Sequence, residues 1–301
     1  MPELVTDNAL SRAIAQVAGD VEKVLGYLLP ADDGPEKRLF EAMRYTALGG
    51  GKRLRPFLVV TSGQMFGVAR AAALRVAAAV ECVHSYSLIH DDLPCMDDDD
   101  LRRGRPANHI AFDEATAILA GDALLTRAFG ILAEEATHGD PRVRCELVHA
   151  LAEAAGDRGM VGGQIIDLMA ENETLDASAI TRLQQMKTGA IISFSAEAGA
   201  IMGRAGAEMR HALHAYAHDL GLAFQIIDDL LDIDGDPVQT GKSSGKDAAA
   251  GKATLVSVMG PERARVQAEI LARQAVIHLD VFAEEADLLR QLADFVINRR
   301  K

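Results

Sequence analysis

Tryptophan is absent from this 301-residue sequence, and aromatic residues make up only 4% of it. Apolar residues nevertheless amount to 49%, with alanine and leucine abundant. This combination is typical of helical proteins rather than of β-sandwiches. The first half of the chain also lacks alternating apolar and polar stretches bounded by hairpin dipeptides. The composition therefore favours an all-α fold.

Cysteine is scarce as well, with only Cys82, Cys95 and Cys145 and no CxxC spacing. This pattern indicates neither a disulfide framework nor a zinc site, and it fits a reducing cytosol. The N-terminus has no basic segment followed by an apolar one, and we find no run of about 18 apolar residues. We therefore expect a soluble cytoplasmic protein without stable membrane association.

Positive charge is in deficit, because 31 lysines and arginines face 44 aspartates and glutamates, which leaves a formal net charge of −13. This balance argues against a general binder of nucleic acids or anionic membranes. An anionic ligand would then need a cation to mediate its binding.

Apolar residues recur at steps of three and four along most of the chain, which predicts amphipathic and buried helices. The expected helices cover residues 8–29, 36 to the glycines at 49–51, 69–90, 112–135, 141–155, 161–170, 177–203, 206–233, 261–281 and 284–298. The segment 235–252 is rich in glycine, serine and lysine and predicts a mobile loop. No long linker or repeat divides the chain. We therefore expect a single all-α domain over residues 1–301, a bundle of ten or more helices.

An acidic stretch, Ser87 to Gly104, is the densest cluster of charge. Carboxylates this close repel one another unless a cation lies among them. Oxygen ligands favour Mg²⁺ over zinc, and Cys95 is expected to be a spectator. The arginines that follow point to a phosphate-bearing ligand, and a solvated acidic loop is the alternative. The charged residues are Asp91, Asp92, Asp97, Asp98, Asp99, Asp100, Arg102 and Arg103.

A second acidic cluster, FQIIDDLLDIDGD, follows later in the chain. Asp228 and Asp232 lie one above the other on a helix face, and Asp229 points about 100° away. The flanking apolar residues leave only a narrow polar stripe, and buried carboxylates are rare unless they are paired or metal-bound. A polar helix side turned to water is the alternative. Two such helices facing each other across a bundle would form a metal cage.

Basic residues accompany these clusters. The segment GGGKRLRP places Lys52, Arg53 and Arg55 in a glycine-rich turn, whose backbone N–H groups could also face a phosphate. His84 lies two helical turns before Asp91, at about 10 Å along the same face. For the basic loop a solvated surface is at least as good an interpretation. A lone histidine on a helix is usually structural or exposed.

Together these motifs resemble one family, the short-chain trans-polyprenyl diphosphate synthases. Two acidic motifs in the family's order, with a basic loop before them and a KTG segment between them, form a very specific pattern. The matching segments are GGGKRLRP (49–56), DDLPCMD (91–97), GDALL (121–125), GMVGGQIIDL (159–168), KTG (187–189), FQIIDDLLD (224–232) and GKATL (251–255).

The resemblance implies an isoprenoid synthase-type bundle around a central cavity, and a homodimer. It implies a prenyltransferase that joins isopentenyl diphosphate head to tail to dimethylallyl or geranyl diphosphate through an allylic carbocation and releases diphosphate. Three Mg²⁺ ions per active site are expected. By the same resemblance, the metal-binding set is Asp91, Asp92, Asp97, Asp228, Asp229 and Asp232.

The resemblance divides the remaining polar residues by substrate. The allylic diphosphate is expected to bind Arg102, Lys187, Lys242 and Lys252. Isopentenyl diphosphate is expected to bind Lys52, Arg55, His84 and Arg103. Oxygen dipoles of Thr188, Gln225 and the Lys187 carbonyl are expected to face the allylic cation.

Tyr86 and Ser87 are the predicted determinants of product length. Tyr86 lies about one and a half turns before Asp91, where a growing hydrocarbon chain would meet a bulky ring. Within the family this indicates a fifteen-carbon product, (2E,6E)-farnesyl diphosphate. Geranyl and geranylgeranyl diphosphate are alternative products, and an ordinary core role for Tyr86 is the alternative for the residue. A terpene cyclase or a non-catalytic regulatory subunit is expected to have altered acidic motifs, whereas both motifs are intact.

Overall fold

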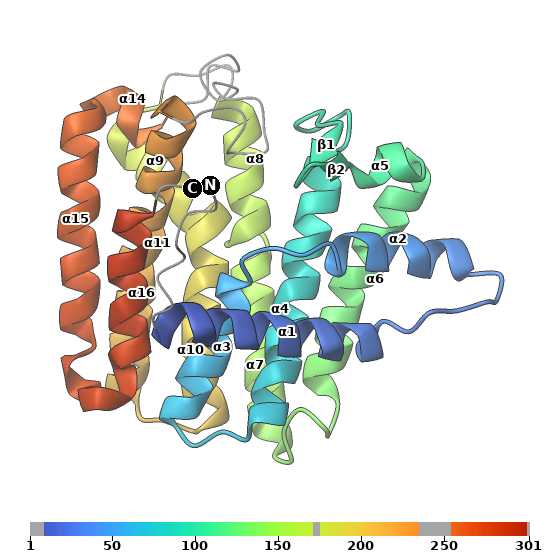
Figure 1. Cartoon of the computed structure of the whole chain (residues 1–301), viewed down its shortest axis with the longest axis horizontal. Coiled ribbons are helices and arrows are strands. Elements are labelled where there is room, and N and C mark those ends of the chain that lie inside the picture. The colour runs from blue at the N-terminus through green and yellow to red at the C-terminus, as the bar shows by residue number, and fades with distance from the viewer. Residues whose placement is uncertain (1–8, 171–174, 235–253, 300–301) are drawn as a thin grey trace. The chain divides into compact units, whose positions relative to one another are not determined.

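The computed structural model describes residues 9–170, 175–234 and 254–299, which form two compact units, Met1–Val148 and His149–Lys301. In these ranges the regular structure is almost entirely helical (Figure 1), so the all-α prediction is confirmed. Whether residues 1–301 form a single domain stays a prediction. The loop predicted at 235–252, with Lys242, Lys246 and Lys252, lies outside the described residues.

The first unit is built around a central helix, α4, against which α1, α3 and α6 pack. The alanine-rich α4 is buried on most sides, whereas α1 buries one stripe that includes Val17, Val21 and Leu25. Helix α7 runs across the boundary into the second unit. The elements are α1 (Ala9–Leu28), α2 (Lys37–Ala47), α3 (Leu54–Met65), α4 (Arg70–Asp91), β1 (Leu101–Arg102), β2 (Arg105–Pro106), α5 (Asn108–Ala111), α6 (Glu114–Ala133) and α7 (Pro141–Ala155).

The second unit is built around α11, which packs against α10, α15 and α16. Side-chain caps start two of its helices: Asp176 accepts from the Ala179 N–H at 2.8 Å, and Thr254 forms a capping box with Ser257. The elements are α8 (Met160–Ala170), α9 (Ala177–Gln184), the π-helical turn η1 (Gln185–Gly189), α10 (Ala190–Met202), α11 (Ala207–Asp234), α14 (Leu255–Met259), α15 (Pro261–His278), the 3-10 helix η2 (Asp280–Ala286) and α16 (Asp287–Asn298).

The structure adds helix α3 (Leu54–Met65), which was not among the expected helices, and it corrects the expected elements in three further places. A short hairpin of β1 and β2 begins inside the acidic stretch, directly after Asp100, with Arg103 and Gly104 at positive φ in its two-residue turn. Strands of two residues are too short to show an alternation of apolar and polar side chains, so they were not predicted from the sequence. The helix expected at 177–203 is divided into α9 and α10 by η1. The helix expected at 261–281 ends at His278, and η2 precedes α16.

Among the described residues, two helices, α4 and α6, are long and apolar enough to cross a membrane by length and composition alone. In its most apolar stretch α4 is 72% buried inside the protein, as expected of a core helix, whereas α6 is 39% buried. Ile118 and Leu119 are among the exposed apolar side chains of α6. The surface of α6 is therefore a candidate for contact with another protein chain.

Candidate active site

The first acidic motif begins at the C-terminal end of α4 and curls back on itself. The Asp97 N–H donates to the Asp91 carbonyl at 2.8 Å, and the Asp99 N–H donates to the Asp92 carbonyl at 3.2 Å. Asp91 and Asp97 are both half-buried. The backbone therefore holds Asp91 and Asp97, two of the residues that the family pattern assigns to metal, next to each other.

Asp92 differs from Asp91 because it is buried and engaged with Arg102. Its Oδ1 accepts from Arg102 Nε at 2.8 Å and also from Nη2. Arg102 Nη2 lies 3.7 Å from Asp99 Oδ2. Burial alone would lower the pKa of Arg102, but the hydrogen bonds and negative charge of Asp92 raise it above its usual value. Asp92 thus holds the predicted diphosphate ligand Arg102 in place, together with Asp99, for which the sequence had suggested no role.

The β1–β2 hairpin separates the two consecutive arginines. Arg102 reaches Asp92, whereas Arg103 in the turn donates through Nη1 to the Gly50 carbonyl of the basic loop. Both arginines line a small cavity of about 30 Å³. That Arg102 and Arg103 serve different diphosphates stays a prediction.

His84 lies among the arginines that are expected to bind isopentenyl diphosphate. Burial, followed by the positive charges of Arg55 and Arg103, holds the pKa of His84 well below its usual range. The imidazole is therefore neutral at neutral pH and has one N–H to donate. Of the predicted set, the structure places His84, Arg55 and Arg103 in one electrostatic neighbourhood.

Arg53, between the predicted ligands Lys52 and Arg55, turns into the core. Its φ is 51°, in the left-handed region, and it pairs through Nη1 with Glu81 Oε1 of α4. Its Nη2 donates to the Ala47 carbonyl at 2.7 Å. Sequence reasoning could not separate Arg53 from its neighbours, because three basic residues in a loop show no periodicity. Arg53 anchors the basic loop to α4.

Tyr86, the predicted limit on chain length, is only 6% exposed. Its ring meets the His90 ring edge to face, with centroids 5.6 Å apart. His90 Nε2 lies 3.0 Å from the Ile118 carbonyl of α6, and a Cβ at Gly121 would come within 2.1 Å of that nitrogen. The absence of a Cβ at Gly121 in GDALL therefore leaves room for the His90 ring between α4 and α6. Ser87 donates its hydroxyl to the His84 carbonyl at 3.0 Å.

The second acidic motif lies near the end of α11. The Asp228 side chain is 45% exposed and accepts from Arg299 Nη2 at 2.6 Å. The Arg299 guanidinium also lies 3.9 Å from the centre of the Phe224 ring. Asp232, one turn after Asp228, is half-buried. The pairing of Arg299 with Asp228 was not predicted from the sequence.

Asp229 is buried, and both of its oxygens accept hydrogen bonds from amides. Gln225 Nε2 donates to Oδ1 at 2.9 Å, and Gln184 Nε2 donates to Oδ2 at 3.2 Å. Thr188 donates its hydroxyl to Gln225 Oε1 at 3.4 Å. A chain of hydrogen bonds through Gln225 therefore joins Asp229 of the second acidic motif to Thr188 of the KTG segment.

Lys187 is carried by η1 and forms an ion pair with Asp167 of α8, with 2.5 Å between Nζ and Oδ2. Helix α8 and η1 approach so closely that a Cβ on Gly163 would lie 2.2 Å from the backbone nitrogen of Lys187. A π-helical turn is frequent at functional sites, and here it holds both Lys187 and Thr188. The GMVGGQIIDL segment thus contributes Asp167, which the sequence had not singled out.

The predicted metal ligands fit a hard divalent cation in their chemistry. Among the described residues, no group of three or more His, Cys, Asp or Glu side chains is close enough together to hold a metal ion. However, the half-buried Asp91, Asp97 and Asp228 offer only oxygen donors, which suit Mg²⁺. Lys242 and Lys252, predicted to bind diphosphate, lie outside the described residues.

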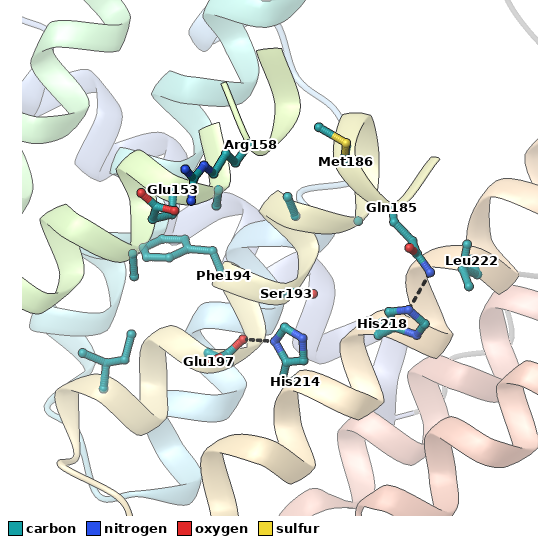
Figure 2. Close-up of a pocket in the computed structure, with 15 residues that line it drawn as sticks. Glu153, Arg158, Gln185, Met186, Ser193, Phe194, Glu197, His214, His218 and Leu222 are labelled. Atoms are coloured by element: carbon teal, nitrogen blue, oxygen red, sulfur yellow. Dashed lines mark hydrogen bonds and ion pairs between the residues drawn. The ribbon is translucent and has the colours of Figure 1, made fainter. Parts of the chain in front are cut away.

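A pocket of about 460 Å³ lies beside η1 in the second unit (Figure 2). Its lining comes from the end of α7, from η1 and α10, and from α11. His214 Nδ1 lies 2.6 Å from Glu197 Oε1, a contact that raises the pKa of His214, and His218 is hydrogen-bonded to Gln185. None of the residues that line this pocket belongs to the predicted site.

The fold and these side chains define an all-α protein of the isoprenoid synthase type, with two pairs of adjacent aspartates accompanied by basic residues. A family model described as "Polyprenyl synthetase" matches residues 36–287, and the chain therefore belongs to that family. This result confirms the resemblance seen in the sequence.

Individual relatives agree with the family. The chain is 47% identical over 278 residues to the farnesyl diphosphate synthase of Escherichia coli, covering 91% of this chain and 92% of the relative. It is 40% identical to that of Haemophilus influenzae, covering 96% and 98%. The crystal structure of an apo FPP/GFPP synthase from Zymomonas mobilis superposes with a TM-score of 0.88 at 55% identity, covering 96% and 98%.

Proposed function

We propose that this chain is a magnesium-dependent prenyltransferase that makes (2E,6E)-farnesyl diphosphate. It joins isopentenyl diphosphate to dimethylallyl diphosphate and then to the resulting geranyl diphosphate. The observation that carries the proposal is the near full-length similarity to farnesyl diphosphate synthases, with both acidic motifs intact. An eroded motif would have favoured a non-catalytic subunit.

The allylic diphosphate is bound by positive charge. Arg102, fixed by Asp92, and Lys187, fixed by Asp167, are the described residues of the proposed set. Asp91, Asp97 and Asp228 would hold Mg²⁺, which supplies further neutralisation of the leaving diphosphate. Charge stabilisation of this kind lowers the barrier to cleavage of the carbon–oxygen bond.

Cleavage leaves an allylic carbocation and a free diphosphate. Gln225 Oε1 and Thr188 provide the oxygen dipoles that stabilise this cation, as already expected from the sequence. The alkene of isopentenyl diphosphate attacks the cation, and the released diphosphate takes the proton that leaves. In the second substrate's site, neutral His84 donates a hydrogen bond beside the guanidinium groups of Arg55 and Arg103.

We further propose a cytoplasmic homodimer without stable membrane association. The exposed apolar side chains of α6, Ile118 and Leu119, support contact with a second copy of the chain. One functional domain over residues 1–301 agrees with the family match, which runs through both compact units.

Product analysis tests the proposal. The protein is incubated with labelled isopentenyl diphosphate and either dimethylallyl or geranyl diphosphate, with Mg²⁺ or with a chelator, and the prenyl products are separated by chromatography. A fifteen-carbon product that forms only with Mg²⁺ is expected. No condensation with either starter would refute the enzyme, and a geranyl or geranylgeranyl product would replace the farnesyl assignment with one of the alternatives.

Tyr86→Ala tests the limit on chain length. Removing the ring opens space beside His90 and Gly121, so products longer than fifteen carbons are expected. Tyr86→Phe keeps the ring without the hydroxyl and should still stop at fifteen carbons. An unchanged product from Tyr86→Ala would show that Tyr86 is not the limit.

A further inference from the structure

The two adjacent aspartates of α11 have opposite surroundings. Asp228 has a side chain that is 45% exposed, whereas Asp229 is 5% exposed. Successive residues on a helix point about 100° apart, so one aspartate faces outward from the packed side while the other enters it. Asp229 therefore faces groups that Asp228 does not.

Those groups fix the direction of one catalytic dipole. An ionised carboxylate only accepts hydrogen bonds, so the end of Gln225 that meets Asp229 Oδ1 at 2.9 Å has to be the NH₂ group. The carbonyl end, Oε1, then points the other way and accepts from the Thr188 hydroxyl. Without Asp229, the two ends of the amide would be nearly interchangeable.

A second amide holds Asp229 itself. Gln184, which immediately precedes η1, is buried and donates through Nε2 to Asp229 Oδ2 at 3.2 Å. The carboxylate is thus connected both to Gln225 on its own helix and to the segment that leads into Lys187 and Thr188. Such an arrangement restricts the rotation of the carboxylate as well as that of the amide.

We propose that Asp229 is a positioning residue that directs the carbonyl oxygen of Gln225 toward the allylic cation, and that it does not act as a metal ligand. This inference rests on the proposed function, because the cation arises only in that reaction. It separates the two neighbouring aspartates by role: Asp228 belongs with the metal, and Asp229 belongs with the cation-stabilising oxygens.

Asp229→Asn tests this with almost no change in shape. Because the asparagine side chain both donates and accepts, it no longer selects one orientation of Gln225. We expect kcat to fall by about 10- to 100-fold, the range seen when partners that orient active-site groups are removed. The KM values and the Mg²⁺ concentration for half-maximal activity should stay within about twofold of wild type. The matched substitution Asp228→Asn should instead raise the Mg²⁺ requirement.

A double-mutant cycle tests whether Asp229 acts through Gln225. In a Gln225→Ala background, Asp229→Asn should lower kcat no further, because the group it orients has gone. A further loss equal to that in the wild-type background, or a raised Mg²⁺ requirement in Asp229→Asn, would overturn the inference. Gln225→Glu sets two carboxylates against each other, and adding Asp229→Asn to it should restore kcat; no recovery would also count against the proposal.

One readout needs no turnover and so separates this inference from the proposed function. In protein labelled with ¹⁵N-glutamine, the Gln225 NH₂ signal is assigned by its loss in Gln225→Ala. We expect slow solvent exchange of this signal in the wild type and fast exchange in Asp229→Asn, with unchanged thermal unfolding as the check on folding. Equal exchange in both proteins would overturn the positioning role even if the wild type makes farnesyl diphosphate. An inactive wild type would refute the function alone.

Discussion

Arg53 and Glu81 form an ion pair inside the first unit, and replacing Glu81 with glutamine removes its negative charge. The two side chains are only 2% and 3% exposed. Removing one member of such a pair leaves an uncompensated buried charge, which lowers the free energy of unfolding by about 3–5 kcal/mol. This is a large fraction of a typical total of about 5–15 kcal/mol. The corresponding fall in Tm is roughly 6 to 20 °C.

Urea denaturation followed by circular dichroism, together with a thermal melt, measures the effect. Asp20→Asn serves as the control because it breaks the exposed ion pair with Arg70, worth about 0.2–1 kcal/mol. The double variant Arg53→Met with Glu81→Leu should recover most of the loss, since it leaves no charge behind. A loss below about 1 kcal/mol in Glu81→Gln would refute the reasoning that Arg53 depends on this partner.

Three further predictions concern the site. The pKa of His84 is lower in the folded protein than in the unfolded chain, so below about pH 6.5 the unfolded chain binds more protons. The free energy of unfolding should therefore fall as the pH decreases, by up to about 1.4 kcal/mol per pH unit. His84→Gln should flatten this slope in urea titrations. Gly163→Ala should push η1 away from α8, which should lower kcat and reduce the free energy of unfolding by about 1–3 kcal/mol. Gly19→Ala, where a Cβ meets open space, should change neither quantity. Asp91→Ala and Asp228→Ala should each abolish Mg²⁺-dependent turnover, and wild-type turnover in either would contradict the metal assignment.

Much of the helical pattern could be predicted because apolar spacing reports directly on local structure. The helix expected at 141–155 matches α7 in both bounds, and α4 starts and ends within one residue of expectation. The acidic motif after α4 was also recognisable, because six carboxylates in ten residues need no tertiary information.

The pairing of side chains was not predictable, because it depends on which elements pack together. The three basic residues at positions 52, 53 and 55 looked alike until the fold showed Arg53 turned inward to Glu81. Likewise, the 100° offset of Asp229 indicated a different direction but not the glutamine it meets. The contact of Arg299 with Asp228 joins positions 71 residues apart, so no local pattern contained it.

The π-helical turn η1 makes the site sensitive to the length of the chain. A π turn accommodates an extra residue compared with an α-helical turn. Deleting a single residue between Gln185 and Gly189 would allow a continuous α-helix, in which the residues before and after the turn keep their register while the residues inside the turn take new directions. Lys187 and Thr188 would then lose their registry with Asp167 and Gln225, although each of those four residues could remain unchanged. A related sequence that kept every motif residue but lacked one residue in this segment would therefore be a poor guide to the activity of this protein.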